Sequence, residues 1–264
     1  MSTHSAMPAL QVANLSLRFG GLVAVADLTF DVMEGEVLSL IGPNGAGKTS
    51  AFNAITGYIP AASGTIHYRG KPLLGLQPNQ IAEQGVVRTF QKTSVFAGQT
   101  ALDNVLIGLH RRSKQTALAI VLGLPSVARE EAELRDRAQE TLEFIGLGHR
   151  GAELGSALPY GEQRLLEVAV ALAADPSLLL LDEPVSGMNP SETESFMRLL
   201  AKIRQRGITI LLVEHDMRMV MGVSDRVVVL NQGRIIANGP PSVIQRDPKV
   251  IAAYLGEKFA RAQG

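Results

Sequence analysis

A chain of 264 residues fits one large domain, or one domain that carries a sizeable subdomain. Hydrophobic residues make up 46% and charged residues 19%, which favours a packed core and excludes wholesale disorder. Lys and Arg number 25, as do Asp and Glu, so the formal net charge is zero, which argues against the basic footprint of a nucleic-acid-binding protein. The absence of cysteine excludes disulfides, thiol catalysis and Cys-ligated zinc.

Neither a secretory signal nor a membrane span is predicted. Residues 1–16 lack a charged segment followed by an apolar one. The most apolar stretch, TALAIVLGLPSVA at residues 116–128, contains a proline and is shorter than the roughly 20 residues that cross a bilayer. From the sequence we expect a soluble, cytoplasmic protein.

The N-terminal part reads as a series of short strands. ALQVANLSLRF (9–19), LVAVADLTFDV (22–32) and EVLSLIG (36–42) are β-like runs separated by turns that contain glycine. An apolar helix, AFNAITGYIP, is predicted over 51–60, where Gly57 and Pro60 close it. A strand and turn follow at 64–73, and a strand-like segment, VVRTFQ, ends at residue 91.

The pattern changes to helical from about residue 98 to 158. TALDNVLIGLHRR (100–112) and REEAELRDRAQETLEFIGLG (129–148) carry charge on one side. The second has apolar residues at three- and four-residue spacing, namely Leu134, Ala138, Leu142 and Ile145.

The C-terminal part alternates strands with a helix. SLLLLDEP (177–184), ITILLVEHD (208–216) and RVVVLNQGRII (226–236) are predicted strands, the first of them fully buried. Between them, residues 190–207 form a predicted helix with a capping box of Ser191 and Glu194 and an end at Gly207. Its apolar stripe consists of Phe196, Leu199, Leu200 and Ile203. This alternation predicts an α/β fold around a parallel sheet, with a core over 8–91 and 175–264 and an inserted helical subdomain over 92–174.

The segment GPNGAGKT (42–49) fits the phosphate-loop pattern G-x-x-x-x-G-K-S/T between a predicted strand and a predicted helix. Its glycines let consecutive N–H groups point at phosphate oxygens, and the helix start favours the same anions. Lys48 is expected on the β- and γ-phosphates and the Thr49 hydroxyl on Mg²⁺. The expected nucleotide-binding residues are Gly42, Pro43, Asn44, Gly45, Ala46, Gly47, Lys48, Thr49 and Ser50. The competing interpretation is a plain glycine-rich turn.

Two carboxylates follow the buried strand LLLL. Asp182 stands where open α/β sheets bind ligands and is expected to hold Mg²⁺, directly or through water. The adjacent Glu183 can polarise an attacking water. The competing interpretation is a pair of solvated carboxylates after a core strand.

Three single residues extend this set. Gln91 is expected to reach the metal or the water, and His215, at the end of another strand, to contact the γ-phosphate. Phe19 is a candidate platform for adenine stacking. Taken alone, a glutamine is usually a surface residue, a histidine a structural one and a strand phenylalanine part of the core.

Taken in chain order, these segments resemble the ATP-binding subunits of ABC transporters over nearly the whole length. The resemblance rests on FGG with Phe19, GPNGAGKTS, RTFQ with Gln91, LPYGEQ, LLLLDEP, SGMNP and VEHD with His215. More narrowly, LPYGEQRLLEVAVALAADPSLLLLDEPVSGMNP, LLVEHDMRMVM and DPKVIAAYLGE look like the LivG-like branch, which serves branched-chain amino acid importers. The resemblance implies a P-loop RecA-like core with an N-terminal antiparallel β subdomain and an inserted α-helical subdomain.

The resemblance also implies a head-to-tail dimer, in which each ATP lies between one phosphate loop and the partner's LSGGQ-type motif. Here that motif reads LPYGEQ, and Pro159 has neither a hydroxyl nor an N–H donor. Tyr160 keeps its N–H but crowds the approach, so the role is expected to survive in reduced form through Tyr160, Gly161, Glu162 and the helix start. The competing interpretation is a purely structural helix start.

The expected function is ATP hydrolysis that powers solute import, with ATP and Mg²⁺ as cofactors. Glu183 would be the general base, Lys48 and His215 would stabilise γ-phosphate charge, and Thr49, Asp182 and Gln91 would organise Mg²⁺. The resemblance implies permease subunits, a second ATP-binding subunit in a homo- or heterodimer, an indirect solute-binding protein, and a place on the cytoplasmic side of the inner membrane.

The permease is expected to dock after Gln91, around Val95 and Phe96, although these residues can equally be subdomain core. The sequence bears on three alternatives. One phosphate loop, no sustained heptad array and zero net charge argue against an ABC-type ATPase acting on nucleic acid or the ribosome, and Glu183 argues against a regulator that does not hydrolyse ATP. The solute stays open between branched-chain amino acids, other hydrophobic amino acids, urea and other amides.

Overall fold

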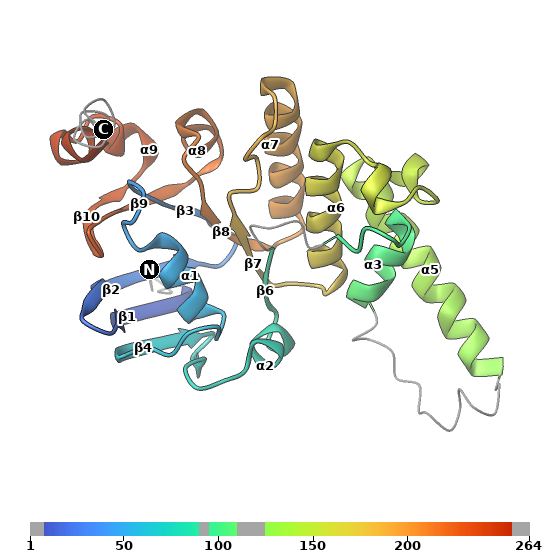
Figure 1. The fold of residues 1–264 in the computed structure, drawn as a ribbon, viewed down its shortest axis with the longest axis horizontal. Coiled ribbons are helices and arrows are strands. Elements are labelled where there is room, and N and C mark those ends of the chain that lie inside the picture. Colours follow the sequence, from blue (N-terminus) through green and yellow to red (C-terminus); the bar gives the residue numbers. More distant parts are fainter. Residues whose placement is uncertain (1–7, 90–94, 110–124, 255–264) are drawn as a thin grey trace, which may run out of the picture. The chain divides into compact units, whose positions relative to one another are not determined.

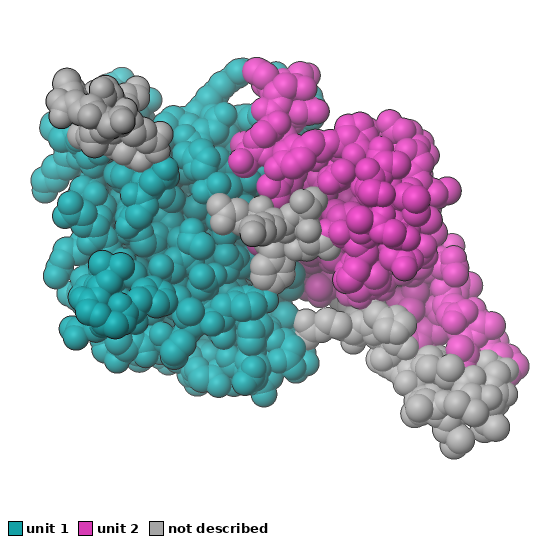
Figure 2. Space-filling view, viewed as in Figure 1, with its two compact units in different colours: residues 1–88, 177–184, 193–264 teal, residues 89–176, 185–192 magenta. Residues whose placement is uncertain are grey.

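The computed structural model describes residues 8–89, 95–109 and 125–254 (Figure 1). The chain divides into two compact units. Unit 1 comprises Met1–Arg88, Ser177–Pro184 and Thr193–Gly264, and unit 2 comprises Thr89–Pro176 and Val185–Glu192 (Figure 2). None of the helices described is long and apolar enough to cross a membrane.

Unit 1 contains two sheets of different kinds. The four-stranded antiparallel sheet has the order β2-β1-β4-β5, formed by β1 (Pro8–Phe19), β2 (Leu22–Met33), β4 (Ser63–Tyr68) and β5 (Lys71–Pro72). The six-stranded sheet has the order β10-β9-β3-β8-β7-β6. Its strands are β3 (Val37–Ile41), β6 (Val86–Arg88), β7 (Leu178–Asp182), β8 (Thr209–Val213), β9 (Arg226–Asn231) and β10 (Arg234–Gly239). The predicted α/β core and antiparallel β subdomain are confirmed.

The register of the larger sheet brings several strand ends to one edge. Strands β9, β3, β8, β7 and β6 are parallel neighbours, and only β10 pairs in the antiparallel sense. Residues that follow the carboxyl ends of β3, β7 and β8 therefore meet at the same edge, which is where open α/β sheets bind ligands.

The core of unit 1 covers both faces of this sheet. Helix α1 (Lys48–Ile55) buries Phe52 and Ile55 between the two sheets, in one cluster with residues of β1, β2, β4, β3 and β7. Ile41, on the opposite face of β3 from Leu40, packs with Val220 of α8 (Met217–Val223) and Ile244 of α9 (Pro241–Ile244). Figure 1 shows α1 and α8 on opposite sides of the strands. The alternation of side chains along buried strands thus holds the phosphate-loop helix against one face.

Helix α2 (Pro78–Glu83) was not predicted. It starts with a capping box, in which the Gln77 N–H donates to Gln80 Oε1 at 2.8 Å, and with a proline at its first position. Only Ile81 of this helix is buried. A helix of six residues with one buried side chain has no repeating apolar pattern, so the sequence alone does not predict it.

Helix α7 (Pro190–Gln205) has the predicted stripe, because Phe196, Leu199, Leu200 and Ile203 are buried. The predicted capping box of Ser191 and Glu194 is wrong. Asn189 Oδ1 instead accepts the N–H groups of Ser191 and Glu192, each at 3.0 Å, and the Asn189 N–H donates to Glu192 Oε2 at 2.8 Å. The cap lies two residues earlier because Pro190 occupies the first helical position, where its missing N–H costs nothing.

Unit 2 is helical. It contains α3 (Ala101–Leu109), α5 (Pro125–Ile145) and α6 (Tyr160–Ala173), with 3₁₀ turns η2 (Gly148–Arg150) and η3 (Gly155–Ala157). The three helices pack against one another. In α5 the predicted stripe is buried at Ala138, Leu142 and Ile145, whereas Leu134 is only half-buried. In α6 Val168 and Ala169 are buried as expected, but Leu165 and Leu172 are half-buried.

Candidate nucleotide-binding and hydrolysis site

The phosphate-binding segment follows β3 directly and ends in α1. Gly47 is the N-cap of α1 and has φ 103°, a left-handed conformation that favours glycine. A Cβ at this position would also stand 2.6 Å from the Ala24 carbonyl oxygen. The loop is closed by bonds from the Ala46 N–H to Pro43 O and from the Gly233 N–H to Ala46 O. Asn44, Gly45 and Thr49 are exposed, so the outer surface of the loop is open to a ligand.

Lys48 lies inside this loop. Its side chain is buried, and Nζ donates to Gly42 O at 2.7 Å and to Pro43 O at 3.0 Å. These carbonyl bonds keep the ammonium at the first turn of α1, where the helix dipole also favours anions. A phosphate oxygen that entered the loop would therefore meet a cation already in position.

Asp182 is the last residue of β7 and is fully buried. Arg88, the last residue of β6, donates from Nη2 to Asp182 Oδ2 at 2.7 Å and from Nη1 to Asn53 Oδ1 at 2.6 Å. Both side chains of the ion pair are nearly inaccessible, at 7% and 0% exposure. Arg88 thereby joins the carboxylate of Asp182 to helix α1, which carries the phosphate loop.

Arg88 was not predicted as a site residue. The sequence did contain an indication of its role. Arg88 begins RTFQ at the end of an apolar strand, and an arginine buried at such a place needs an acidic partner. That partner lies 94 residues away in the chain, which no local pattern reveals.

The donor set fits Mg²⁺ only together with phosphate oxygens. Asp182 Oδ1 is buried and accepts no hydrogen bond from the part of the chain that the structure describes, so one carboxylate oxygen remains for a metal or its water. Among the residues described, no group of three or more His, Asp or Glu side chains could hold a metal ion by itself. This pattern agrees with magnesium, which usually uses one or two carboxylates plus substrate phosphates. Gln91, the other expected ligand besides Thr49, lies outside the described residues.

Glu183 and His215 lie side by side after β7 and β8. His215 Nδ1 is 3.4 Å from Glu183 Oε1, and the Glu183 N–H donates to Val213 O at 2.8 Å. Glu183 has φ 50°, an unusual conformation for a residue with a side chain and one often found at functional sites. His215 is about half exposed, with 49% of its side chain accessible, so the pair is open to solvent.

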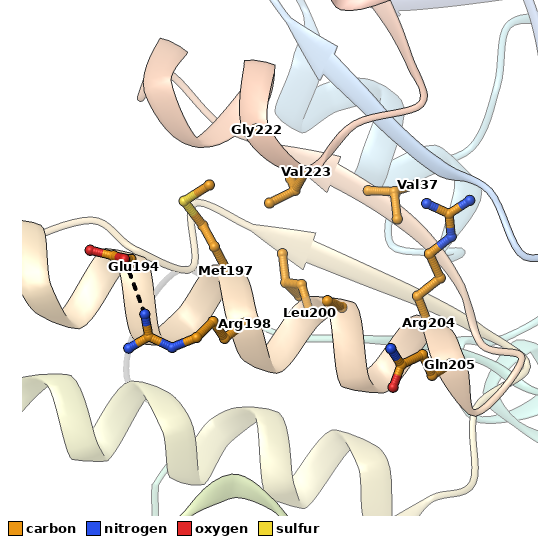
Figure 3. A pocket seen from close by; sticks show the side chains of 10 residues that line it. Val37, Glu194, Met197, Arg198, Leu200, Arg204, Gln205, Gly222 and Val223 are labelled. Atoms are coloured by element: carbon orange, nitrogen blue, oxygen red, sulfur yellow. Dashed lines mark hydrogen bonds and ion pairs between the residues drawn. The ribbon is translucent and has the colours of Figure 1, made fainter.

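Two further features of unit 1 are the exposed ring of Phe19 and a surface pocket. Phe19, at the end of β1, is 48% exposed rather than part of the core. A pocket of about 550 Å³ lies between α7 and α8, where Met197, Leu200, Gly222 and Val223 contribute to its wall (Figure 3). None of the candidate nucleotide-binding residues lines this pocket.

The segment LPYGEQ lies in unit 2 and begins α6. Pro159 is the N-cap and supplies no side-chain capping bond, as expected for a residue without a polar side chain. Tyr160 is 44% exposed and Gly161 is buried. The Glu162 carboxylate is 3.2 Å from Arg150 Nε.

A glycine-rich loop between a parallel strand and a helix, with a buried aspartate at a neighbouring strand end, defines a P-loop nucleotide-binding domain. The family model described as "ABC transporter" matches residues 25–186, which is more than half of the chain. The chain therefore belongs to the ABC transporter family, as its motifs predicted. The cassettes of this family are ATPases coupled to transport, and this chain is such an ATPase.

Individual relatives agree with this assignment. The chain is 47% identical to the high-affinity branched-chain amino acid transport ATP-binding protein LivG of Salmonella typhimurium, over 95% of this chain and 98% of that one. It is 44% identical to BraF of Pseudomonas aeruginosa, a protein described in the same words, over the same shares. A solved ATP-binding cassette of an ABC transporter in its ADP conformation matches with a TM-score of 0.84 at 31% identity, over 95% of this chain and 99% of that one. Residues 234–260 match the family model described as "Branched-chain amino acid ATP-binding cassette transporter".

Proposed function

We propose that this chain is the ATP-hydrolysing subunit of an importer for branched-chain amino acids. The observation that carries the proposal is the meeting of Lys48, Asp182, Glu183 and His215 at the ends of β3, β7 and β8 in one sheet. The choice of solute class is supported by the names of LivG and BraF and by the family match at residues 234–260.

The roles follow from the chemistry of each group. Lys48 binds the β- and γ-phosphates, and the exposed residue Thr49 and Asp182 Oδ1 would hold Mg²⁺ or its water. Bound Mg²⁺ would neutralise charge on the phosphate oxygens. Glu183 accepts a proton from the attacking water or orients it, and His215, 3.4 Å away, holds the Glu183 carboxylate and contacts the γ-phosphate. Gln91 is assigned to the metal by its motif alone.

Outside the phosphate site, Phe19 offers its exposed ring to the adenine. The backbone of Tyr160 and Gly161, with Glu162, faces the phosphate held by a second ATP-binding subunit. Because Pro159 removes one donor from that motif, pairing with a different chain that carries an intact motif would give two sites with unequal turnover. We propose such a heterodimer, held at the cytoplasmic side of the inner membrane by permease subunits that receive solute from a binding protein.

The permease docks on the surface formed by residues 95–100 and 154–156 of unit 2. These two segments are joined by the Thr100–Leu154 bridge and by the Gly155 N–H, which donates to Gln99 O at 2.8 Å. Phe96 is 52% and Leu154 is 48% exposed on it. Large apolar side chains exposed together mark interaction surfaces more often than core.

The test uses the chain co-expressed with its permease subunits in membrane vesicles. Glu183→Gln should lower ATP hydrolysis about 10²- to 10⁴-fold while nucleotide binding persists, because the substitution keeps shape and removes the proton acceptor. Glu194→Gln, an exposed residue of α7, is the matched control and should leave hydrolysis and uptake unchanged. Leucine uptake should fall with hydrolysis. The proposal fails if Glu183→Gln hydrolyses ATP normally, or if the chain purifies with ribosomes or nucleic acid rather than with membrane proteins.

A further inference from the structure

The tyrosine that replaces a small residue in LPYGEQ packs against a second segment of unit 2. A Cβ added to Gly187 would stand 2.8 Å from Tyr160 Cε1 and 3.4 Å from Tyr160 Cζ, so the ring lies directly on this glycine. Gly187 has φ 81° and is part of Val185–Glu192, the segment that follows Glu183 after Pro184. No side chain fits between the ring and the backbone at this point.

The ring is itself held in place from α6. Arg164 donates to the Tyr160 hydroxyl from Nε at 3.0 Å and from Nη2 at 2.7 Å. Its Nη1 donates to Glu167 Oε2 at 3.0 Å, and both Arg164 and Glu167 are buried. The guanidinium of an arginine is planar and rigid, and pairing it with a buried carboxylate leaves it little freedom to move. The exposed ring therefore has a rigid attachment.

The neighbouring residue makes a second contact with the same segment. A Cβ on Gly161 would stand 2.8 Å from Glu192 Oε1, and Glu192 Oε2 accepts the Asn189 N–H at 2.8 Å. Two consecutive residues of LPYGEQ thus touch both ends of residues 187–192. The start of α6 and this segment are packed as one piece.

We propose that Tyr160 is a positioning residue that ties the partner-phosphate motif to the segment following Asp182 and Glu183. This inference rests on the proposed function, because it gives LPYGEQ its place at the partner's ATP. A change at that phosphate, sensed at the start of α6, moves Gly187 with it. Since the segment is continuous with Glu183, the same movement reaches the chain's own hydrolysis site. The tyrosine thus adds a mechanical link where the motif has lost a hydroxyl donor.

A double-mutant cycle measures the contact without relying on catalysis. Gly187→Ala has two costs in the wild type, namely a side chain at positive φ and a collision with the Tyr160 ring. In the Tyr160→Ala background only the first cost remains. Hydrogen exchange of residues 185–192 should therefore accelerate less on Gly187→Ala when Tyr160 is alanine, with a coupling of about 2- to 100-fold, the range for residues in contact. Additive effects of the two substitutions would overturn the contact as an energetic link.

Steady-state hydrolysis by the assembled transporter tests the consequence. Tyr160→Ala should lower kcat about 10- to 100-fold with KM for ATP nearly unchanged, as expected when positioned groups are displaced. Tyr160→Phe keeps the ring on Gly187 and loses only the Arg164 bonds, so its kcat should be intermediate. If Tyr160→Ala changes only KM or only thermal stability, or if phenylalanine behaves like alanine, the positioning role is wrong. A wild-type complex that hydrolyses no ATP would instead refute the proposed function, and the exchange cycle would still decide whether the ring couples the two segments.

Discussion

At the scale of single residues, Arg88 links three parts of unit 1 through one buried guanidinium. It bonds Asp182 on β7, Asn53 on α1 and Thr56 at the C-cap of α1, so its guanidinium joins the Asp182 carboxylate to the phosphate-loop helix. Arg88→Ala would leave the Asp182 carboxylate buried without its cation. We expect the free energy of unfolding to fall by about 3–5 kcal/mol, the cost of breaking a buried ion pair by removing one partner.

Urea unfolding of the isolated chain measures this effect. Arg88→Lys keeps the charge but cannot make the same forked bonds, so its loss should be intermediate. Arg198→Ala removes an exposed arginine that pairs with Glu194 at the surface of α7, and it should change the stability by less than about 1 kcal/mol. If Arg88→Ala costs no more than Arg198→Ala, the buried ion pair contributes little to the stability of the fold.

Those parts of the candidate site could be predicted from sequence in which reactive residue types stand next to a recognisable strand, turn or helix. The phosphate loop was predicted because a strand, a glycine-rich turn and a helix follow one another within a few residues, and Asp182 and Glu183 were predicted because two carboxylates follow a buried apolar strand. Arg88 was missed because its partner is distant in the chain, and the Tyr160–Gly187 contact was missed for the same reason. A contact between segments that are far apart in the chain produces no periodic pattern in the sequence.

At the scale of elements, two residues compete as the N-cap of α7, and their contributions to stability can be compared. Asn189 Oδ1 accepts two N–H groups of the first turn, whereas Glu194 makes only an exposed bond to Arg198 Nη1. We expect Asn189→Ala to lower stability by about 1 kcal/mol, the usual worth of an N-cap. Glu194→Ala should cost only a few tenths of that, about 0.2–0.5 kcal/mol, as for an i,i+4 pair. Thermal unfolding of both variants compares them directly, and a larger loss for Glu194→Ala would restore the capping box inferred from sequence.

The length and burial of a helix decide whether a sequence pattern can predict it. Helix α7 was recognised because four buried residues repeat with helical spacing over 16 residues. Its cap was misplaced by two residues, since both Asn189 and Ser191 are good caps and only the position of Pro190 separates them. Helix α2 was missed because a six-residue helix with one buried side chain has no stripe. Periodicity predicts the middle of long elements better than their ends.

At the scale of the whole molecule, we propose that the apolar surface of residues 95–100 and 154–156 joins the ATPase to its permease. Phe96→Asp and Leu154→Asp place a charge on side chains that are about half exposed, so folding and nucleotide binding of the isolated chain should be unchanged. Co-purification with the permease subunits should weaken by at least about 30-fold, because an interface hot spot is worth about 2 kcal/mol or more. Val243→Asp in α9 is the matched control, since Val243 is 57% exposed and lies in unit 1. Equal retention of the permease by all three variants would show that docking uses another surface, whereas loss with Val243→Asp alone would move the interface to unit 1.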